Sequence, residues 1–586
     1  MSTAVKATVA IDFGTTFSGF AYSNNSHQNR GATEHIYMSK KWGHNRGIST
    51  LRTPTCMLLK PDKGFDAFGY DAQEKFASLE GGTDKEYYYL ERFKMELHNR
   101  EKIDVNTELT ASNGKRVNAL LVFAEAIKFL ATEAVEVIRQ RSGSKLSKDD
   151  IQWILTVPAI WNQVSKQFMR EACIEASIIT RENPRQLMLA LEPEAAGLDC
   201  RTRSMAEFVD GKSKEKCGDV TAKPGTTYMV IDNGGGTVDI TVHRINKDQT
   251  IDELHRPTGG AWGGICVEEA FEKLMSDLFG SKFIAEYKYS YPAQWTELMT
   301  DFEMKKQSPK LSNEYTRIRF PYDLFTKAKI TTRARCRFEA DDVKLTGGYL
   351  RLSPSVMMGL FEKPVNNITN FVADLLKDRQ FDNVTIMFLV GGFSDSPFLR
   401  KKFDDKFGSK YKILTPIDAS LCVVRGAVLF GQKPEIISTR VSPYTYGTYL
   451  TVLFEESEHE ERYRYTYMGD EFCDIFHKLV TTGEKVKLGE IRSVTTYPVN
   501  ESQKTVDIDF YITANKKVTY VNEPHVRKVA SVTLESLNTS KGNDRQFKLD
   551  IQFGNTEIQA TTKDEESGNS KIVFLDFFSH STERGS

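Results

Sequence analysis

Two distant segments of the chain share the same order of apolar and polar residues. Each is a β-branched, apolar run that ends in an aspartate and is followed by a turn rich in glycine and threonine and by a second apolar run. The segments are ATVAIDFGTTFSGFAY, at residues 7–22, and YMVIDNGGGTVDITV, at residues 228–242. This pattern is typical of a β-hairpin. The repetition predicts an internal duplication of the chain.

Helix and strand patterns alternate after each hairpin. Apolar residues at helical spacing predict a helix from 119 to about 140, and an apolar run predicts a strand at 151–157, with a helix after Pro158. A further apolar run at 383–390 predicts another strand. This alternation indicates α/β lobes with mixed sheets. The polar stretch at 201–224 predicts an exposed connection between the two copies.

The pattern changes toward the C-terminal end. Residues 432–443 carry prolines around a short apolar patch, which is typical of a linker between domains. Beyond them apolar and polar residues alternate with a period of two, most clearly at 547–553. We therefore expect an antiparallel β-sandwich without a helical lid at 444–586. The same boundaries predict a first lobe at 1–225 and a second lobe at 226–431.

Composition narrows the class of protein. The chain has 586 residues, of which 27% are charged and 40% hydrophobic, and its net charge is -1. These values are typical of a folded globular protein and argue against general binding to nucleic acid. No run approaches the roughly 20 apolar residues needed to cross a bilayer, so we expect no membrane insertion. Eight cysteines without a C-x-x-C pair indicate a reducing compartment, the cytoplasm or also the nucleus.

The two hairpin turns have the composition of a phosphate-binding site. Glycine and threonine in a tight turn allow several backbone N–H groups to converge on an anion. Asp12 and Asp232 end the strands that precede these turns, where carboxylates can hold the hydration shell of Mg²⁺. Two such turns that face each other across a cleft would bind a polyphosphate from both sides. The sequence contains neither G-x-x-x-x-G-K-[ST] nor G-x-G-x-x-G, which excludes a P-loop and a Rossmann turn.

The hairpin phrases resemble the phosphate motifs of the actin-like ATPase superfamily, in the form found in 70-kDa heat-shock proteins. Other phrases are similar to further motifs of this family, in the family's order: TVPAIWNQ at 156–163, LEPEAAG at 191–197 and LVGGFSDSP at 389–397. Four phrases are similar to its divergent family-12 branch: FSGFA at 17–21, LERFK at 90–94, GGFSDSP at 391–397 and SPYTYG at 442–447. The resemblance implies a duplicated, ribonuclease H-like α/β fold with two lobes around an ATP or ADP site.

The resemblance also implies roles for individual residues. The phosphates of ATP or ADP would be bound by Gly14, Thr15, Thr16, Gly234, Gly235, Gly236 and Thr237. The hydration shell of Mg²⁺ would be held by Asp12, Glu192 and Asp232. Slow hydrolysis would depend on Lys94, Glu192, Thr237 and Asp239. The adenosine would contact Glu303, Lys306, Gly391, Gly392 and Ser394.

Several features depart from the housekeeping members of this family. Gln307 follows Lys306, where the family usually has an arginine that stacks on the base, so we expect lower adenine affinity. The linker segment 435–440 is short and mixed in charge, which argues against tight coupling between nucleotide and β-domain. The missing lid, and a tail at 582–586 that is not the acidic E-E-V-D, argue against ordinary peptide clamping.

Three functions remain open at this point. The first is a chaperone-like protein of the stress response, a slow ATPase whose nucleotide state regulates binding of protein partners or clients through the β-domain. The second is an adaptor that binds nucleotide with negligible hydrolysis. The third is a small-molecule kinase, which would need a catalytic base in the cleft, and the V-P-A-x-W-N phrase and the β-domain count against it. The sequence does not predict the oligomeric state.

Overall fold

The computed structural model describes residues 5–578 apart from short segments. The residues left out are 1–4, 25–34, 45–46, 48, 80–81, 101, 144–145, 210–222, 308–313, 330–340, 468, 499–500, 536–539, 541, 564–569, 576 and 579–586. Most of the predicted connection at 201–224 and the whole tail at 582–586 therefore lie outside the described residues.

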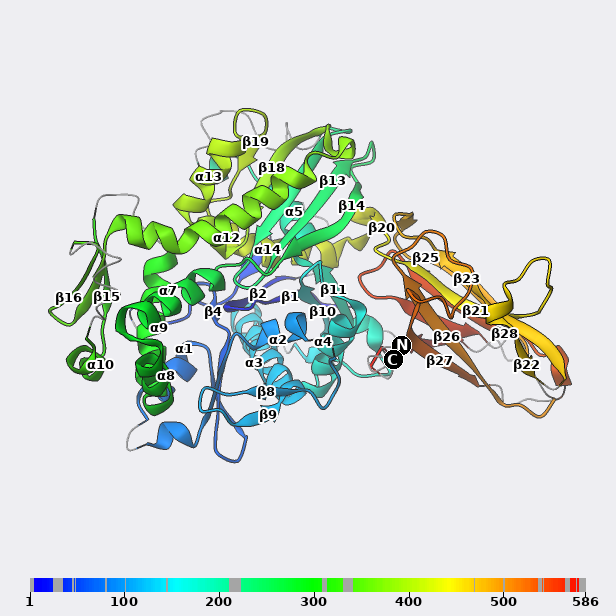
Figure 1. The fold of residues 1–586 in the computed structure, drawn as a ribbon, viewed down its shortest axis with the longest axis horizontal. Coiled ribbons are helices and arrows are strands. Elements are labelled where there is room, and N and C mark those ends of the chain that lie inside the picture. Colours follow the sequence, from blue (N-terminus) through cyan, green and yellow to red (C-terminus); the bar gives the residue numbers. More distant parts are fainter. Residues whose placement is uncertain are drawn as a thin grey trace.

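The sheet of the first lobe is built around the first hairpin (Figure 1). Its strands are, in order across the sheet, β11 (Leu187–Leu191), β10 (Ile151–Val157), β1 (Ala7–Phe13), β2 (Phe17–Asn24) and β3 (Tyr37–Met38), with β4 (Thr53–Pro54) also paired to β2. The strands β1, β10 and β11 are parallel, whereas β2 is antiparallel to both of its neighbours β1 and β3. The predicted hairpin and the predicted strand at 151–157 are confirmed.

The sheet of the second lobe repeats this arrangement. Its first five strands are β19 (Lys412–Leu414), β18 (Val384–Val390), β12 (Thr227–Asn233), β13 (Val238–Ile245) and β14 (Ile251–Gly260). Here β12, β18 and β19 are parallel, and β13 is antiparallel to β12 and β14. The order and the directions match those of the first sheet, so the predicted duplication is confirmed. The mixed α/β architecture agrees with the duplicated fold that the resemblance implies.

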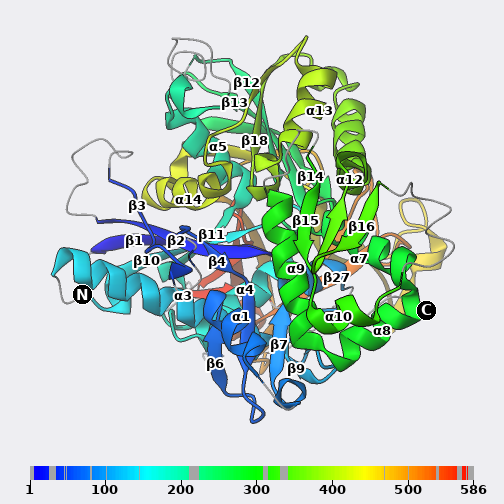
Figure 2. The same ribbon diagram turned by 90° about the vertical axis from the view of Figure 1, so that its left-hand side faces the viewer.

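Two helices lie between the sheets (Figures 1 and 2). These are α5 (Glu192–Thr202) and α14 (Cys422–Gln432), and α14 packs on the first sheet although it follows the second in the chain. The two helices approach so closely that a Cβ at Gly426 would lie 1.6 Å from the carbonyl oxygen of Ala195. Ala10 of β1 and Val230 of β12 belong to the apolar cluster around these helices. This contact therefore joins the two sheets.

The opposite face of the first sheet is covered by α3 (Ala119–Ser142) and α4 (Gln163–Glu175). Both helices were predicted, and both are confirmed. Alternate residues of β1 point to opposite faces of the sheet, so Val9 and Ile11 pack with these helices. Among the described helices, none is both long and apolar enough to span a membrane.

The remaining elements of the two lobes surround the sheets. The helices are α1 (Tyr70–Ala77), α2 (Glu96–Asn99), α7 (Ile265–Phe279), α8 (Ser281–Ser290), α9 (Pro292–Gln307), α10 (Tyr322–Lys327), α12 (Pro354–Leu375) and α13 (Pro397–Phe407). The strands are β5 (Cys56–Leu59), β6 (Phe65–Phe68), β7 (Tyr88–Glu91), β8 (Glu108–Thr110), β9 (Arg116–Asn118), β15 (Thr316–Arg319), β16 (Val343–Thr346) and β17 (Tyr349–Leu352).

The C-terminal region contains two antiparallel sheets that pack face to face (Figure 1). One sheet has the order β22 (Tyr465–Tyr467), β23 (Asp470–Val480), β21 (Thr445–Leu453), β26 (Thr505–Thr513) and β27 (Arg527–Glu535). The other has the order β25 (Glu490–Thr496), β28 (Phe547–Phe553), β29 (Gln559–Lys563) and β30 (Ser570–Phe574). Alternate residues of β28 are buried, as predicted. In the part of this region that the structure describes, no α-helix follows α14.

The predicted linker contains a strand. Within 432–443, β20 (Ile437–Val441) is parallel to β14 of the second lobe. On its other side β20 is antiparallel to β24 (Lys485–Lys487) of the C-terminal region. The sheet of the second lobe therefore continues through the linker into the β-domain.

The close helix contact between the lobes generates a stability prediction. Replacing Gly426→Ala places a methyl group against the backbone of α5, and we expect the free energy of unfolding to fall by about 1–3 kcal/mol. Gly359→Ala, in α12, is the matched control because nothing lies within 4 Å of its added Cβ. Thermal unfolding should show a lower Tm for Gly426→Ala and an unchanged or higher Tm for Gly359→Ala. Equal Tm values for the two variants would contradict the close packing.

Candidate functional site

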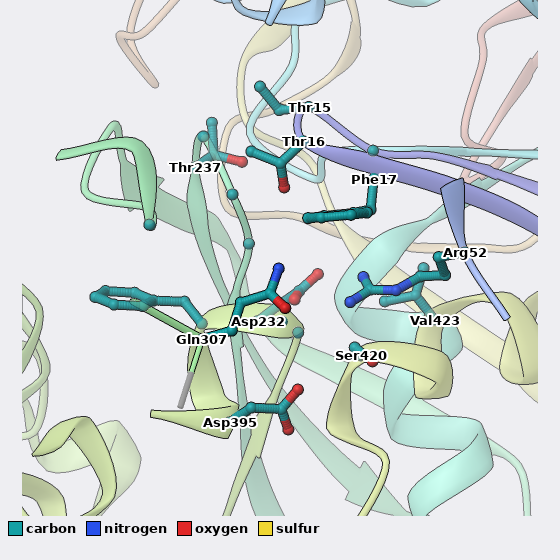
Figure 3. A pocket seen from close by; sticks show the side chains of 18 of the residues that line it. Thr15, Thr16, Phe17, Arg52, Asp232, Thr237, Gln307, Asp395, Ser420 and Val423 are labelled. Atoms are coloured by element: carbon teal, nitrogen blue, oxygen red, sulfur yellow. The ribbon is translucent and has the colours of Figure 1, made fainter. Parts of the chain in front are cut away.

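A cavity of about 390 Å³ lies between the lobes, at the ends of β1 and β12 (Figure 3). Most of the predicted site residues line it. They are Asp12, Gly14, Thr15, Thr16, Lys94, Glu192, Asp232, Gly234, Gly235, Gly236, Thr237, Glu303, Lys306, Gly391 and Gly392. The cavity thus brings together residues from both hairpins, from α5 and α9, and from the segment after β18.

The two hairpin turns face each other across this cavity. A Cβ added at Gly235 would lie 2.4 Å from the hydroxyl of Thr16, and one added at Gly236 would lie 2.8 Å from the hydroxyl of Thr15. Figure 3 shows Thr15 and Thr16 close to Thr237 of the opposite turn. No side chain fits at Gly235 or Gly236, so the close approach requires glycine.

The second turn is held in shape by the start of α7. The backbone N–H groups of Gly263, Gly264 and Ile265 donate to the carbonyl oxygens of Gly236, Gly234 and Gly235, at 3.0, 3.1 and 2.8 Å. Three backbone hydrogen bonds to three successive glycines replace the rigidity that side chains would otherwise provide. The turn is therefore preorganised in spite of its composition.

Carboxylates from both lobes are buried at the floor of the cavity. Asp12 accepts a hydrogen bond from the hydroxyl of Thr156 at 2.8 Å, and Lys94 Nζ donates to Glu192 Oε1 at 2.6 Å. Burial raises the pKa values of Asp12 and Asp232, and it raises the pKa of Glu192 to about 7, against the opposing charge of Lys94. The cluster carries more negative groups than cations, so it favours a bound cation.

The resemblance implies a hydrated magnesium ion at this cluster, held through water by Asp12, Glu192 and Asp232. Among the described residues, no group of three histidine, cysteine or acidic side chains is close enough together to hold an ion directly. Mg²⁺ commonly keeps several waters and is bound through one or two carboxylates and substrate phosphates. Gly391, at φ 80°, allows the backbone to pass Asp232, because a Cβ there would lie 2.3 Å from Asp232 Oδ1. Access to that carboxylate therefore depends on glycine.

Lys94 is a buried residue of the cavity. It belongs to the short 3-10 helix Phe93–Met95, and only 2% of the residue is exposed. Its ammonium group lies 5.2 Å from the ring centroid of Trp161. Lys94 is therefore not a solvated surface lysine.

Two predicted site residues do not line the cavity. Asp239 is 1% exposed, and its Oδ1 accepts a hydrogen bond from the N–H of Ile160 at 2.9 Å. Ser394 is fully buried; its hydroxyl donates to the carbonyl oxygen of Val390 at 2.6 Å and accepts from Asn233 Nδ2 at 2.9 Å. In this structure neither side chain lines the cavity, so the roles that the resemblance implies for Asp239 and Ser394 remain predictions. Asp239 instead connects β13 to the segment after β10, and Ser394 fixes Asn233 at the end of β12.

Two of the predicted adenosine residues, Glu303 and Lys306, belong to a charged network that joins the lobes. Lys306 Nζ donates to Glu303 Oε2 at 2.9 Å and also to Glu268, and Glu268 accepts from Arg92 of the first lobe. Burial and the neighbouring Glu303 raise the pKa of Glu268 to about 8. Although burial opposes it, Lys306 lowers the pKa of Glu303 to about 2. Gln307 donates to Glu303 at 3.3 Å.

Arg52 is the main cavity residue that sequence analysis missed. Its guanidinium lies 5.4 Å from the ring centroid of Phe17, and its Nη2 lies 3.3 Å from where a Cβ of Gly392 would be. Its side chain has no hydrogen bond or ion pair with another described residue. Figure 3 shows Arg52 on the same cavity as Asp395, whose pKa burial raises to about 6. Arg52 lies in a loop outside every motif, so no local pattern indicates it.

Comparisons with known proteins place this site in a family. The chain is 34% identical over 623 residues to heat shock 70 kDa protein 12A of Mus musculus. This match covers 98% of the chain and 91% of that relative. It is 34% identical over 631 residues to heat shock 70 kDa protein 12B of Homo sapiens, with the same coverage. It is 25% identical over 308 residues to the chaperone protein DnaK of Elusimicrobium minutum, over 50% of the chain and 42% of that relative. No family model matches the chain.

The long matches run through both lobes, the linker and the β-domain, whereas the DnaK match covers half of the chain. The duplicated sheets and the facing glycine turns agree with this relationship. Membership of the family implies the actin-like ATPase fold and a nucleotide as the ligand of the cleft. The chain belongs to the 70-kDa heat-shock protein family, in the branch of proteins 12A and 12B.

Proposed function

We propose that the cleft binds ATP and ADP with a hydrated Mg²⁺ ion, hydrolyses ATP slowly, and regulates binding of protein partners through the β-domain. The observation that carries this proposal is the pair of glycine and threonine turns that face each other above buried carboxylates. Backbone N–H groups in such turns bind phosphate oxygens. The membership of the chain in the 70-kDa heat-shock family supports the nucleotide as the ligand.

Different residues of the cleft would have different roles in phosphoryl transfer. Thr15, Thr16 and the glycines at 234–236 would orient the phosphates, and Asp12, Glu192 and Asp232 would hold the waters of Mg²⁺. When bound, Mg²⁺ neutralises charge on the phosphates. Lys94 adds a positive charge at the cavity, held in place by Glu192. Positioning and charge stabilisation of this kind supply most of the catalysis in phosphoryl transfer.

A buried ion pair supports coupling between the cleft and the linker. Glu194, two residues after Glu192 in α5, accepts hydrogen bonds from Arg440 Nε at 2.8 Å and Nη2 at 2.5 Å. Arg440 lies in β20, and its Nη1 donates to the carbonyl oxygen of Gly554 in the β-domain at 2.9 Å. The mixed charge of the linker segment predicts that this coupling is not tight. The positive charge of Arg440 is instead what connects the linker to the first turn of α5.

A second connection runs through the segment between β10 and α4. Ile160 donates its N–H to Asp239 beside the second turn, and Trp161 lies against Lys94. Further along, Arg170 of α4 donates to both carboxylate oxygens of Glu557 in the β-domain, at 2.8 and 2.6 Å. The β-domain therefore contacts a helix whose preceding segment is held by cleft residues.

An adaptor that binds nucleotide with negligible hydrolysis is the second candidate function. The observation that favours it is the position of Asp239. Its Oδ1 accepts the N–H of Ile160, and the residue does not line the cavity in this arrangement, so its carboxylate is engaged by the protein backbone. The two candidates share the nucleotide site and differ only in turnover.

The carboxylates predict a magnesium-dependent affinity. We expect Asp12→Asn together with Asp232→Asn to reduce the affinity for ATP in the presence of Mg²⁺ by at least about tenfold, because two charge-assisted contacts are lost. Affinity in EDTA should change little. Calorimetric titration of ATP measures both values, and Asp248→Asn, at an exposed turn, is the control. Unchanged affinity of the double variant in Mg²⁺ would exclude these carboxylates as the ion site.

Lys94 predicts a loss of turnover without a loss of binding. In single-turnover hydrolysis of ATP, Lys94→Ala should lower the rate at least about 10²-fold. Enzymes lose about this much when one preorganised group that stabilises transition-state charge is removed. The affinity for ATP should stay within a few-fold of the unchanged protein. Hydrolysis that proceeds equally without Lys94 would contradict its role. Tight binding with no turnover in either protein would establish the adaptor.

The ion pair between α5 and the linker predicts that amide hydrogen exchange in β20 depends on the bound nucleotide. Amide hydrogen exchange of 437–441 should differ between the ATP and ADP states of the unchanged protein. We expect Glu194→Gln with Arg440→Met to abolish this difference and to retain ATP binding, because both charges of the buried pair are removed together. Glu286→Gln, which breaks the exposed pair with Lys282, is the control. A difference that persists in the double variant would exclude this route of coupling.

A further inference from the structure

A second cavity, of about 330 Å³, lies where the first lobe, the linker strand and the β-domain meet. Trp161 and Lys166 contribute to its wall from the first lobe, and Glu253 contributes from the second lobe. Tyr446, Phe553 and Thr556 contribute from the β-domain. It is separate from the nucleotide cleft, because the two cavities share no lining residue.

Lys166 is a buried cation without a partner. It lies in the first turn of α4, it is 7% exposed, and its ammonium group makes no hydrogen bond or ion pair with another described residue. The nearby carboxylates of Glu194 and Glu557 are engaged by Arg440 and Arg170. Burial, with the charge of Arg440, lowers the pKa of Lys166 to about 8. An unpaired buried charge is costly, so a compensating group in the cavity would be stabilising.

Other polar atoms on the cavity residues also lack partners. In the described part of the chain, Glu253 Oε1 and Thr556 Oγ1 are buried and make no hydrogen bond. Burial, together with the charge of Glu194, raises the pKa of Glu253 well above its usual range, which favours the protonated acid with its O–H donor. Glu253 is the one acidic residue among the described residues that line the cavity. The wall therefore offers an ammonium, an acid O–H and a hydroxyl, and this set of donors suits an anion.

Aromatic side chains form one part of the wall. The rings of Tyr446 and Phe553 lie 5.7 Å apart between their centroids, and Tyr444 meets Tyr446 edge to face at 6.2 Å. Trp161 contributes from the first lobe. A volume of about 330 Å³ lies within the range of cavities that hold small organic molecules. An occupant of matching chemistry has a charged head and an apolar body.

We propose that this cavity binds a small organic anion, with its carboxylate head at Lys166 and its apolar body against Tyr446 and Phe553. Because the wall is assembled from both lobes, the linker and the β-domain, the ligand makes all its contacts only while these parts are docked. It therefore stabilises the docked arrangement by its differential affinity for that state. The expected effect of nucleotide on this ligand rests on the proposed function, whereas binding of the ligand itself does not. If nucleotide changes docking, nucleotide and anion change each other's affinity by the same factor.

Calorimetry of the full chain without nucleotide tests the site directly. The probes are 3-phenylpropionate and its neutral amide, 3-phenylpropionamide, which have the same apolar body. We expect the acid to bind more tightly than the amide. Lys166→Met should weaken binding of the acid by about tenfold or more and leave the amide unchanged, because one charge-assisted contact is lost. Lys166→Arg should retain acid binding, and Lys282→Met, at an exposed position, is the matched control.

A second readout separates a ligand site from a structural charge. Lys166→Met removes an unpaired buried ammonium, so its Tm should equal or exceed that of the unchanged protein. The acid should slow amide hydrogen exchange at 437–441 and 553–558 in the unchanged protein and not in Lys166→Met.

Equal affinity for acid and amide, no binding of the acid at millimolar concentration, or full binding to Lys166→Met would overturn the site. Binding without slower exchange would overturn the docking role. All these measurements omit ATP, so a failure of the nucleotide proposal would not alter them.

Discussion

The contact between the two glycine turns is the constraint on which the rest of the structure depends. Gly235 and Gly236 lie so close to Thr16 and Thr15 that no Cβ fits between them. Each turn ends a central strand of its own sheet, so the contact sets how near the two sheets can come at this end. The packing of Gly426 against Ala195 sets their distance at the other side of the cleft. A cavity of defined width follows from two contacts that only glycine permits.

The first turn of α5 explains how a buried cleft can be connected to a distant domain. Glu192 and Glu194 are two residues apart, and successive helical residues are rotated by about 100°. Their carboxylates therefore point to nearly opposite sides, one to Lys94 in the cleft and the other to Arg440 in the linker. A change that moves one carboxylate with its backbone also moves the other. Since both ion pairs are buried, neither is screened by solvent to the degree of a surface pair.

Sequence patterns predicted the parts of this molecule that depend on neighbouring residues. The hairpins, the strand at 151–157 and the alternation in β28 follow from local periodicity, and the facing turns follow from repeating one hairpin. Arg52 and β20 could not be found in this way. Arg52 reaches Gly392 of the other lobe from a loop. β20 is a strand because it pairs with β14 on one side and with β24 on the other. Ser394 lies in a matching motif, yet its hydroxyl is used by Asn233. Such roles depend on contacts between residues far apart in the chain.

One thin layer of structure separates the nucleotide cleft from the cavity at Lys166. The nucleotide cleft and the cavity at Lys166 are separated by the first turn of α5 and by the segment before α4, where Ile160 and Trp161 face the cleft residues Asp239 and Lys94. A layer held by buried ion pairs on both sides has little freedom to deform continuously, because protein interiors are close-packed. It can shift only if the pairs on one side exchange partners. Coupling through this layer is therefore expected to be between discrete arrangements, docked and undocked, and a ligand on either side acts by favouring one of them.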